Sequence, residues 1–440
     1  MRRVLAVLTA LSVGGLACSY RKQVDPIPVV AYENDGDRLS VPTTRSWDLS
    51  FDRPEEFGIV SSVAVCDDTA YLTDLRQRVV HIASLSSGRI TGRFAPAERM
   101  EAPISTTADC ERATVYVVDQ NFVWSLSTSD NRRYSRLPLP KGFLPTPDSA
   151  VLEGTGDGRT LLISGLWADS SQWQSRPLER MLDGYKVGLA LNVTTGSGRY
   201  LLNGSVTTRC RIFAAACFAN YLDRLSGNGR ERYVASPSLS ADVGLYDAQG
   251  ALLRSMSIRS PRFRTDNRML PAGAPIEESV SWGTSNSTLA GLFTAGNEVY
   301  AVHAVHTTKD WHKGDWIQFD VRLNVLTTSG EGIMADLKLP DFPVGRSADG
   351  LLVVDYGPTG RREHAQHVRL IEIPLRLSVW QRFGVPLARS QTSSPVTPTT
   401  EKGLTHVTGK AAMARGRALA RHTVARNIWP QAVSERTDLV

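Results

Sequence analysis

The 440-residue sequence lacks several features that mark common protein classes. Beyond its N-terminus no apolar run reaches roughly twenty residues, which excludes a polytopic membrane protein. Aromatic residues make up only 8% and charged residues 21%, but 42% of the residues are hydrophobic, which excludes a wholly disordered chain. No Gly-x-Ser-x-Gly elbow, phosphate-binding loop or His-Glu-x-x-His motif occurs. The sequence therefore carries none of these standard enzyme signatures.

Cysteine is also scarce, with five residues and no CxxC or Cys/His spacing of the kind that binds structural zinc. Apart from Cys18, the cysteines suit an oxidising compartment. Cys66 and Cys110 occupy equivalent positions in adjacent repeats, so a disulfide between them is feasible. Cys210 and Cys217 can pair only if the chain between them turns. Small buried thiols are the alternative for all four, and their pairing stays open.

The N-terminus has two arginines followed by an uninterrupted apolar or small stretch from Val4 to Ala17. This pattern predicts a secretory signal over residues 1–17, too short to span a membrane as a helix. The signal ends in Gly15-Leu16-Ala17-Cys18, which resembles the lipobox of bacterial lipoproteins, although that motif has Leu where Gly15 stands. The resemblance implies lipidation of Cys18 and a membrane anchor. The alternative is ordinary cleavage that leaves Cys18 as a free thiol.

The net charge of +6 is unevenly distributed along the chain. The signal contributes +2 and residues 388–440 contribute +5, so residues 18–387 carry about −1. A nearly neutral central region gives no support for nucleic-acid binding. The tail, 388–440, opens with a Ser/Thr/Pro-rich segment that cannot bury enough apolar surface to fold, and we expect it to be basic and disordered. Contact with an anionic surface is the alternative role for this tail.

A repeat dominates the region between these ends. Its signature is a strand of the form Tyr/Leu-x-x-Asp, with two degenerate copies in the middle of the chain. The six copies begin at Tyr71, Tyr116, Leu162, Tyr233, Tyr300 and Leu352. Each copy lies between two other apolar strands, and turn residues precede a fourth. Four short strands per unit predict the blades of a β-propeller.

The repeat predicts an all-β fold with six four-stranded antiparallel blades in a domain over 45–387, after a linker at 18–44. The blades are expected at 58–96, 98–140, 143–205, 208–260, 276–340 and 341–377. The last unit lacks a fourth strand, and the alternating segment Arg45–Phe51 is predicted to supply it and close the ring. Helical turns are expected only in the inserts 170–186 and 219–230.

The copies at Tyr71-x-x-Asp74 and Tyr116-x-x-Asp119 are similar to NHL-type repeats. Six such repeats after a lipobox-like signal resemble the bacterial six-bladed β-propeller lipoproteins. The resemblance covers about residues 45–377 and implies an exported propeller of the cell envelope. It carries over no catalytic residues, because that family is mostly uncharacterised, and a fold does not define a function.

The repeated aspartates are predicted to be structural. Asp74 and Asp119 each end a second strand, where a carboxylate accepts hydrogen bonds from backbone N–H groups of the following turn.

The fifth repeat differs, because His303 replaces the aspartate and a cluster of His, Asp and Trp follows it. A metal site there is disfavoured, since His303 and His306 are three residues apart on a strand and point to opposite faces. A polar, aromatic ligand-binding loop at one mouth of the ring is the preferred interpretation. The candidate contacts are Trp167, Trp173, His303, Trp311, His312 and Trp316.

The alternative is a calcium-dependent hydrolase of the lactonase or esterase type, with the ion on the propeller axis. Carboxylate and amide oxygens suit Ca²⁺. The candidate ligands are Glu55, Asp148, Asn220 and Glu278. The Glu-Gly-Pro context of such enzymes is absent.

The preferred prediction is therefore a non-catalytic binding or scaffolding module of the bacterial cell envelope, without a cofactor. Its partner is expected to be a small molecule, a glycan or an envelope protein. Membrane contact is expected only through the lipid anchor, with the basic tail as a second contact for anionic surfaces.

Overall fold

The computed structural model describes most of the region between the two ends of the chain. The described residues are 30–33, 40–52, 57–130, 133–154, 156–167, 185–204, 220–225, 231–258, 260, 262–265, 278, 281–282, 285–307, 319–329, 332–357, 365–382 and 388–390. Cys18 lies outside them. Strands account for most of these residues, and the chain is all-β.

Runs of four antiparallel strands are the unit of the fold. In each run consecutive strands pair, so each sheet is a meander. One sheet contains β8 (Ser105–Asp109), β9 (Thr114–Val118), β10 (Phe122–Ser127) and β11 (Tyr134–Pro138). The next contains β12 (Phe143–Glu153), β13 (Thr160–Trp167), β14 (Lys186–Asn192) and β15 (Gly198–Asn203). A third contains β16 (Asn220–Leu225), β17 (Arg232–Pro237), β18 (Asp242–Asp247) and β19 (Leu252–Ser257).

A fifth strand extends the next run. The run comprises β20 (Thr288–Ala295), β21 (Glu298–His306), β22 (Phe319–Thr327) and β23 (Gly332–Leu339). Strand β27 (Ala388–Ser390) pairs with β23. These three residues open the segment that the sequence predicts to be a disordered tail.

The first and last runs join in one eight-stranded sheet. The first run is β4 (Val60–Cys66), β5 (Thr69–Asp74), β6 (Val79–Ser84) and β7 (Arg89–Phe94). The last is β24 (Pro343–Arg346), β25 (Gly350–Asp355), β26 (His367–Pro374) and β3 (Arg45–Ser50). Strand β3 pairs with β26 along six residues, as the alternation of Arg45–Phe51 predicts. A single parallel pair, Ser50 with Arg89, links β3 to β7.

Three small elements complete the described chain. Strands β1 (Val30–Glu33) and β2 (Ser40–Thr43) form a hairpin within the segment expected to be a linker. A 3₁₀ turn covers Gly156–Gly158, and helix α4 covers Leu377–Arg382. In α4 the buried Trp380 packs edge-on against Tyr300 and donates its indole N–H to the Pro374 carbonyl.

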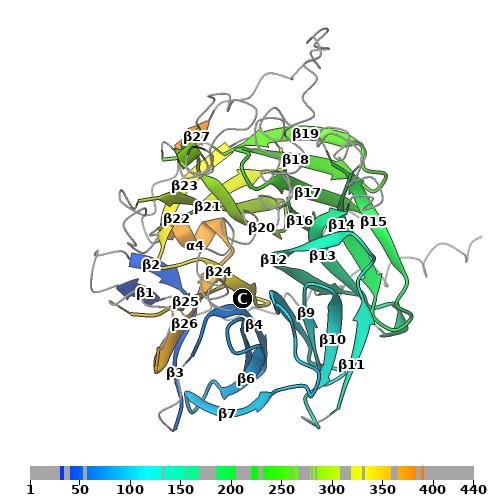
Figure 1. Cartoon of the computed structure of the whole chain (residues 1–440). Helices are drawn as coiled ribbons and strands as arrows, with labels where there is room; N and C mark the ends of the chain where they lie inside the picture. The colour runs from blue at the N-terminus through cyan, green and yellow to red at the C-terminus, as the bar shows by residue number, and fades with distance from the viewer. Residues whose placement is uncertain are drawn as a thin grey trace, which may run out of the picture.

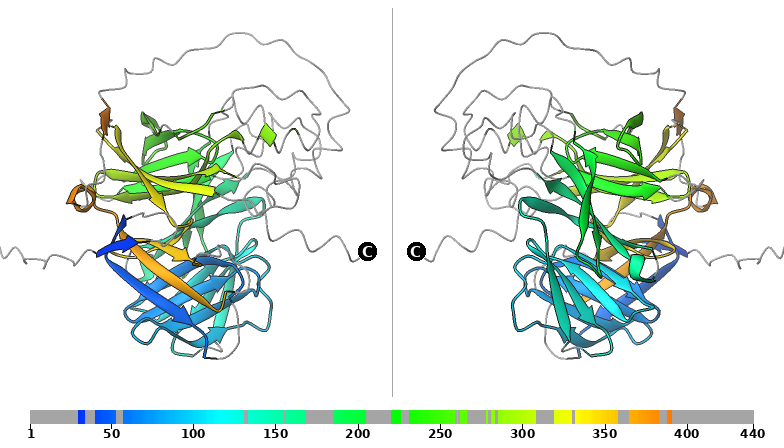
Figure 2. Two further views of the ribbon diagram at one scale, coloured as in Figure 1. Left: turned by 90° about the vertical axis from the view of Figure 1, so that its left-hand side faces the viewer. Right: turned by 90° about the vertical axis from the view of Figure 1, so that its right-hand side faces the viewer.

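The sheets are set around a common centre, with β4, β12, β16, β20 and β24 innermost (Figure 1). The side views show the sheets stacked around that centre (Figure 2). Burial follows this order within a sheet. Strand β5 is buried on both faces for most of its length, whereas the outer strand β7 alternates between exposed and half-buried side chains. This is a β-propeller-like arrangement.

Apolar side chains fill the space between neighbouring sheets. One cluster joins the first and second runs around Trp124, and another joins the second and third around Phe143. A further cluster, with Leu352 and Leu370, packs the last run against the first. Each sheet is thus stabilised on both faces by its neighbours.

The inner strands approach one another closely at Gly345 of β24. A Cβ atom at this position would collide with the main chain of Val63 in β4. Only glycine allows this approach, and it brings the first and last runs together near the axis.

The six copies of the repeat signature all lie in second strands, between the first and third strands of their runs. The expectation of helix across 219–230 is wrong for Asn220–Leu225, which form β16. Tyr221, Leu222 and Leu225 in this short segment are buried among the sheets, and pairing with β17 outweighs local propensity. The other insert, 170–186, lies mostly outside the described residues.

Candidate functional site

A cavity of about 380 Å³ lies where the innermost strands converge. It opens at the end of the ring where the first strand of each run turns into the second. We call this end the short-turn end and the opposite end the long-connection end. The cavity lining comes from β4, β8, β12, β20 and β24 and the turns that follow some of them. Its polar lining residues are Ser62, Ser105, Thr106, Thr107, Asp109, Glu111, Arg159, Arg346 and Ser347.

Two buried serines of this lining connect adjacent sheets. Ser62 Oγ in β4 accepts a hydrogen bond from Thr106 N in β8 at 2.9 Å. Ser105 Oγ in β8 accepts one from Ala150 N in β12, also at 2.9 Å. Since each hydroxyl is used here as an acceptor, its own O–H remains available as a donor. These short side chains hold the inner strands together and present O–H donors at the cavity.

Arg346 at the end of β24 reaches two other sheets. Its Nη1 lies 3.0 Å from Asp223 Oδ2 in β16, and its Nη2 donates to the Thr294 carbonyl in β20 at 2.7 Å. Asp223 is buried and also accepts hydrogen bonds from the backbone N–H groups of Thr294 and Arg224. Burial raises the pKa of Asp223, and the positive charge of Arg346 opposes that rise. The pair fixes a guanidinium group, one third exposed, at the cavity wall.

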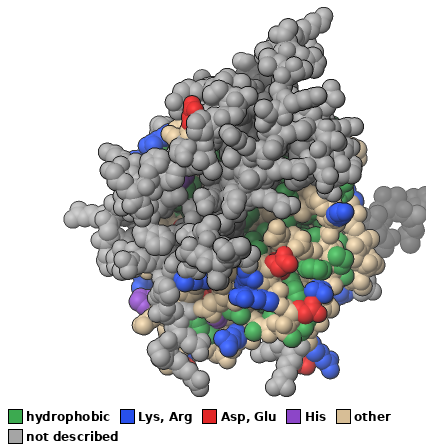
Figure 3. All heavy atoms as spheres, in the orientation of Figure 1, with side chains coloured by type: hydrophobic (Ala, Val, Ile, Leu, Met, Phe, Trp, Pro, Cys, Tyr) green, Lys and Arg blue, Asp and Glu red, His purple; other side chains and the backbone are tan. Residues whose placement is uncertain are grey.

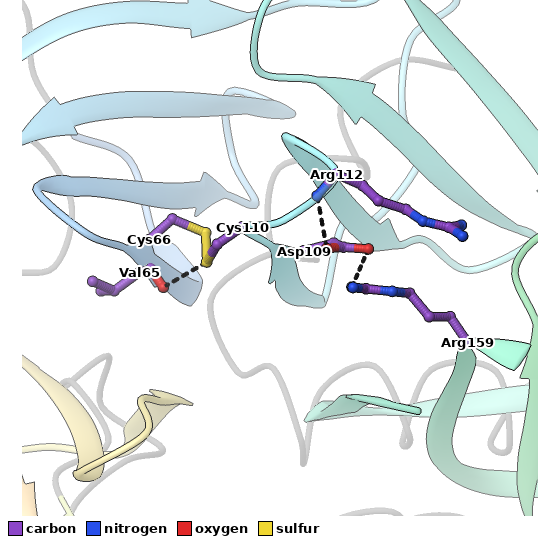
Figure 4. The surroundings of a disulfide bond; sticks show 6 residues. All are labelled: Val65, Cys66, Asp109, Cys110, Arg112 and Arg159. Carbon is purple, nitrogen blue, oxygen red and sulfur yellow. Dashed lines mark hydrogen bonds and ion pairs between the residues drawn. A yellow bond between two sulfur atoms is a disulfide. The ribbon is translucent and has the colours of Figure 1, made fainter. Parts of the chain in front are cut away.

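A second arginine, Arg159, lies deeper, with a side chain 7% exposed. Its guanidinium forms ion pairs with Asp109, which is buried, and Glu111, whose side chain is 78% exposed. The other oxygen of Asp109, Oδ1, accepts a hydrogen bond from the backbone N–H of Arg112 at 3.0 Å. Figure 4 shows the guanidinium of Arg159 directed at the Asp109 carboxylate. Arg159 Nε is buried without a hydrogen-bond partner among the described residues.

A disulfide joins Cys66 and Cys110 beside this ion pair (Figure 4). The two Cα atoms are 5.5 Å apart, within the usual range for a disulfide. Each cysteine follows or ends the first strand of its run, so the bond links the first two runs at the short-turn end. The disulfide that the equivalent positions made feasible is present, and free thiols at these two positions are excluded. Cys210 and Cys217 lie outside the described residues.

Of the tryptophan contacts predicted from sequence, Trp167 is described, and it lies at the other end of the ring. Trp167 ends β13 at the long-connection end, where its indole packs on Tyr200 with centroids 4.9 Å apart. Its indole N–H donates to the Lys141 carbonyl at 3.0 Å. Trp167 thus packs against the outer strand β15 of its own sheet. Trp173, Trp311, His312 and Trp316 lie outside the described residues.

His303 is fully buried in β21, away from the cavity lining. Its Nδ1 lies 3.1 Å from the amide nitrogen of Asn324, and Phe263 packs near its ring. Burial lowers the pKa of His303 to about 4, and it lowers the pKa of His306 to about 4 as well. Both imidazoles are therefore neutral at pH 7. His303 serves as a packed, uncharged group in the place where three of the other repeats have aspartate.

The aspartates of the repeat carry out the structural role predicted for them. Asp74 accepts hydrogen bonds from Gln77 N at 2.9 Å and from Gly58 N at 2.6 Å. Asp119 accepts from Gln120 N in the following turn and from two backbone N–H groups of the preceding connection, and it also accepts from the Trp124 indole. These carboxylates are occupied by their own turns and connections.

The proposed calcium ligands are only partly described. Glu55 and the side chain of Asp148 lie outside the described residues. Asn220 is buried, and its backbone N–H and carbonyl bond the Thr146 hydroxyl, whereas Glu278 is exposed. Within the described part of the chain, no group of three His, Cys, Asp or Glu residues is arranged to hold a metal ion.

Sequence reasoning missed Arg346, Asp223 and Arg159. Asp223 carries only a weak signal, since its strand mixes Tyr and Leu with Asn220 and Arg224, and such a sequence does not mark the carboxylate as buried. The partner, Arg346, is 123 residues away, and local sequence does not reveal it.

The strands and the cavity on their axis define an all-β, β-propeller-like protein with an axial pocket. No helix in the part of the chain described here is both long and apolar enough to cross a membrane.

No protein-family model matches the chain, and no curated protein matches it. A solved member of the DUF4221 family from Bacteroides vulgatus is 9% identical, with a TM-score of 0.48 over 78% of this chain and 97% of that one. A Bacteroides fragilis protein assigned as exported is 9% identical, with a TM-score of 0.44 over 75% and 95% of the two chains. Virginiamycin B lyase from Staphylococcus aureus is 10% identical, with a TM-score of 0.36 over 74% and 99%. Such similarities identify no ligand for this chain.

Proposed function

We propose that the chain is an exported, non-catalytic binding protein of the bacterial cell envelope, built as a six-bladed β-propeller that takes a small ligand in its axial cavity. A glycan end or a segment of an envelope protein would enter by the same short-turn end. The observation that carries this proposal is the cavity itself. Its volume, about 380 Å³, is within the range of small-molecule sites, and hydroxyl, guanidinium and apolar groups converge on it.

The six-bladed architecture is supported by the repeat and by the packing between runs. Each copy of the repeat occupies the second strand of a separate run, and β3 supplies the outer strand of the last run by pairing with β26. The apolar cluster between the last and first runs is as buried as those between consecutive runs. A closed ring of this kind leaves few exposed sheet edges.

Export and lipidation rest on the N-terminal sequence and on cysteine chemistry. A disulfide between Cys66 and Cys110 suits an oxidising compartment. Lipidation at Cys18 would anchor the ring to a membrane surface while it remains in water. Labelling cells with a fatty-acid analogue tests this, because wild type should be labelled and Cys18→Ala should not. Equal absence of label in both would remove the anchor from the proposal.

The binding function is tested by thermal shift with a panel of neutral sugars, sugar acids and amino acids at millimolar concentration. A ligand that binds only the folded state stabilises it by RT ln(1 + L/Kd), where L is the free ligand concentration, and so raises Tm as that concentration increases. Thr107→Phe places a ring in the cavity and should abolish the shift given by any positive compound. Leu253→Phe, on the exposed outer strand β19, is the control and should keep it.

Two results would overturn the binding proposal: no compound shifts Tm, or the shift survives in Thr107→Phe. EDTA distinguishes the hydrolase alternative from the proposed binding function, since a large fall in Tm on adding EDTA would indicate a structural or catalytic calcium ion. Under the proposed function EDTA leaves Tm unchanged.

A further inference from the structure

We infer that the axial cavity binds a small carboxylated polyol of the sugar-acid class, with the carboxylate on Arg346 and the hydroxyl oxygens facing Ser62 and Ser105. This inference rests on the proposed binding function and adds the chemical class of the ligand. It follows from the donors that the cavity presents, from its charge balance and from its apolar walls.

Arg346 has N–H groups to spare. A guanidinium carries five N–H bonds, and among the described residues the hydrogen bonds of Arg346 use one to Asp223 and one to the Thr294 carbonyl. The side chain remains one third exposed at the cavity wall. Because Asp223 and Thr294 fix the group from two different sheets, its remaining N–H bonds hold a set direction. A planar carboxylate is the acceptor that matches this fork.

The enclosed part of the cavity is close to neutral. Asp109 is paired with Arg159 and Asp223 with Arg346, while Glu111 is largely in solvent. Beyond these pairs Arg159 Nε is a donor that is buried without a hydrogen-bond partner among the described residues. Such a site favours an acceptor with one negative charge. A phosphate dianion would need net positive charge that the pairs do not supply.

The rest of the lining suits a polyol. Ser62 and Ser105 each accept a backbone hydrogen bond and retain an O–H that can donate to a ligand oxygen. Ala150, Val151 and Phe293 supply apolar surface for the C–H face of a sugar ring. The volume of about 380 Å³ admits one monosaccharide with room for water.

The test compares D-glucuronate with D-glucose by isothermal titration calorimetry, because the two differ by a carboxylate in place of a CH₂OH group. D-glucuronate should bind the wild type about 10- to 100-fold more tightly than D-glucose, since a charge-assisted hydrogen-bond pair gives this discrimination. Arg346→Gln should lose that advantage and leave the weak binding of D-glucose unchanged. Inorganic phosphate should not displace D-glucuronate.

Arg346→Gln leaves Asp223 buried without its cation, so the fold must be controlled. The double variant Arg346→Gln/Asp223→Asn removes both charges and keeps two polar side chains that can still bond across the sheets. It should therefore fold, as circular dichroism would show. It should still fail to prefer D-glucuronate. Arg346→Lys keeps the charge without the fork and should retain only part of the preference.

Equal affinity for the two sugars, a wild-type preference in the folded double variant, or displacement by phosphate would each overturn the sugar-acid class. Loss of binding of both sugars in Arg346→Gln would overturn it as well. In every one of these cases the binding function is decided separately, by the compound panel and the Thr107→Phe variant.

Discussion

The two ends of the ring use their polar residues in opposite ways. At the short-turn end Arg346 pairs with Asp223, and Arg159 pairs with Asp109. Each pair joins two sheets, and both arginines line the cavity. At the long-connection end the carboxylates of Asp74 and Asp119 are consumed by backbone N–H groups of their own turns and connections.

This contrast separates stability from binding. Where a carboxylate satisfies its own turn, its removal costs stability and changes no ligand contact. Where charged groups from different sheets meet, the geometry of the strands sets their positions. Some of their N–H groups then remain free to donate hydrogen bonds to a ligand. The Cys66–Cys110 disulfide also ties two of the sheets together at that end.

The largest expected effect comes from breaking the short-turn end at its disulfide. The bond closes a loop with a sequence separation of 44, which corresponds to about 4 kcal/mol of unfolding free energy in the chain-entropy model. Cys66→Ser/Cys110→Ser should lower the denaturation midpoint in urea accordingly, and dithiothreitol should do the same to the wild type.

Dithiothreitol should then have little further effect on the double variant. A large residual effect would assign part of the stabilisation to Cys210 and Cys217. If the double variant were as stable as the wild type under oxidising conditions, the disulfide would contribute nothing to the free energy of unfolding.

A somewhat smaller effect is expected at the opposite end, at Asp119. Asp119→Ala leaves three backbone N–H groups and the Trp124 indole without their acceptor and should cost about 3 kcal/mol in chemical denaturation. Binding of any cavity ligand to the folded variant should be unchanged, which sharpens the contrast between the ends. Asp52→Ala, in an exposed ion pair with Arg89, is the control and should cost less than 1 kcal/mol. If the folded Asp119→Ala variant no longer bound the ligand, the separation of stability and binding between the two ends would be wrong.

The smallest effect concerns pH at the long-connection end. The pKa of His303 is about 4 in the folded protein, below the usual 6.5, so protonation favours the unfolded chain. The neutral imidazole of His303 makes its full contribution to the free energy of unfolding above pH 6.5. This contribution is lost as the pH falls from 6.5 toward 4, and the loss amounts to about 1 kcal/mol between pH 7 and 5.5.

His303→Gln should reduce the pH dependence of Tm over that interval and leave the part that comes from His306, whose pKa is also about 4. His367→Gln, at an exposed site, should leave the slope as it is in the wild type. An unchanged slope in His303→Gln would show that this imidazole stays protonatable in the folded state.

Local sequence patterns predicted the strands well, because alternation and turn residues act over a few positions. The Tyr-x-x-Asp strands, the pairing of Arg45–Phe51 with the last run and the turn-binding role of Asp74 and Asp119 are all of this kind. The helix expected at 219–230 failed at Asn220–Leu225, since the partner strand β17 and not local propensity decides the conformation there.

The candidate site was not predictable in the same way. Arg346, Asp223 and Thr294 belong to three sheets, and nothing in a short window shows that they meet. The prediction instead used the dense His and Trp segment that begins at His303, together with Trp167 and Trp173. His303 is buried in β21 and Trp167 packs on its own sheet, while the other candidates lie outside the described residues. Composition identifies where reactive side chains are numerous, whereas the axis of a ring gathers single residues from distant repeats.

The pairing of β3 with β26 has a consequence for how the chain matures. The contact between Thr44 and Glu372 spans 328 residues, and Arg45 also bonds the buried Glu372 carboxylate. The first described strand of the large sheet is therefore synthesised early and receives its partner almost last. Ring closure must wait for nearly the whole chain, and folding dominated by such distant contacts is slow. A chain truncated before His367 would lack β26 and leave that edge of β3 unpaired, so the ring can close only after synthesis has passed β26.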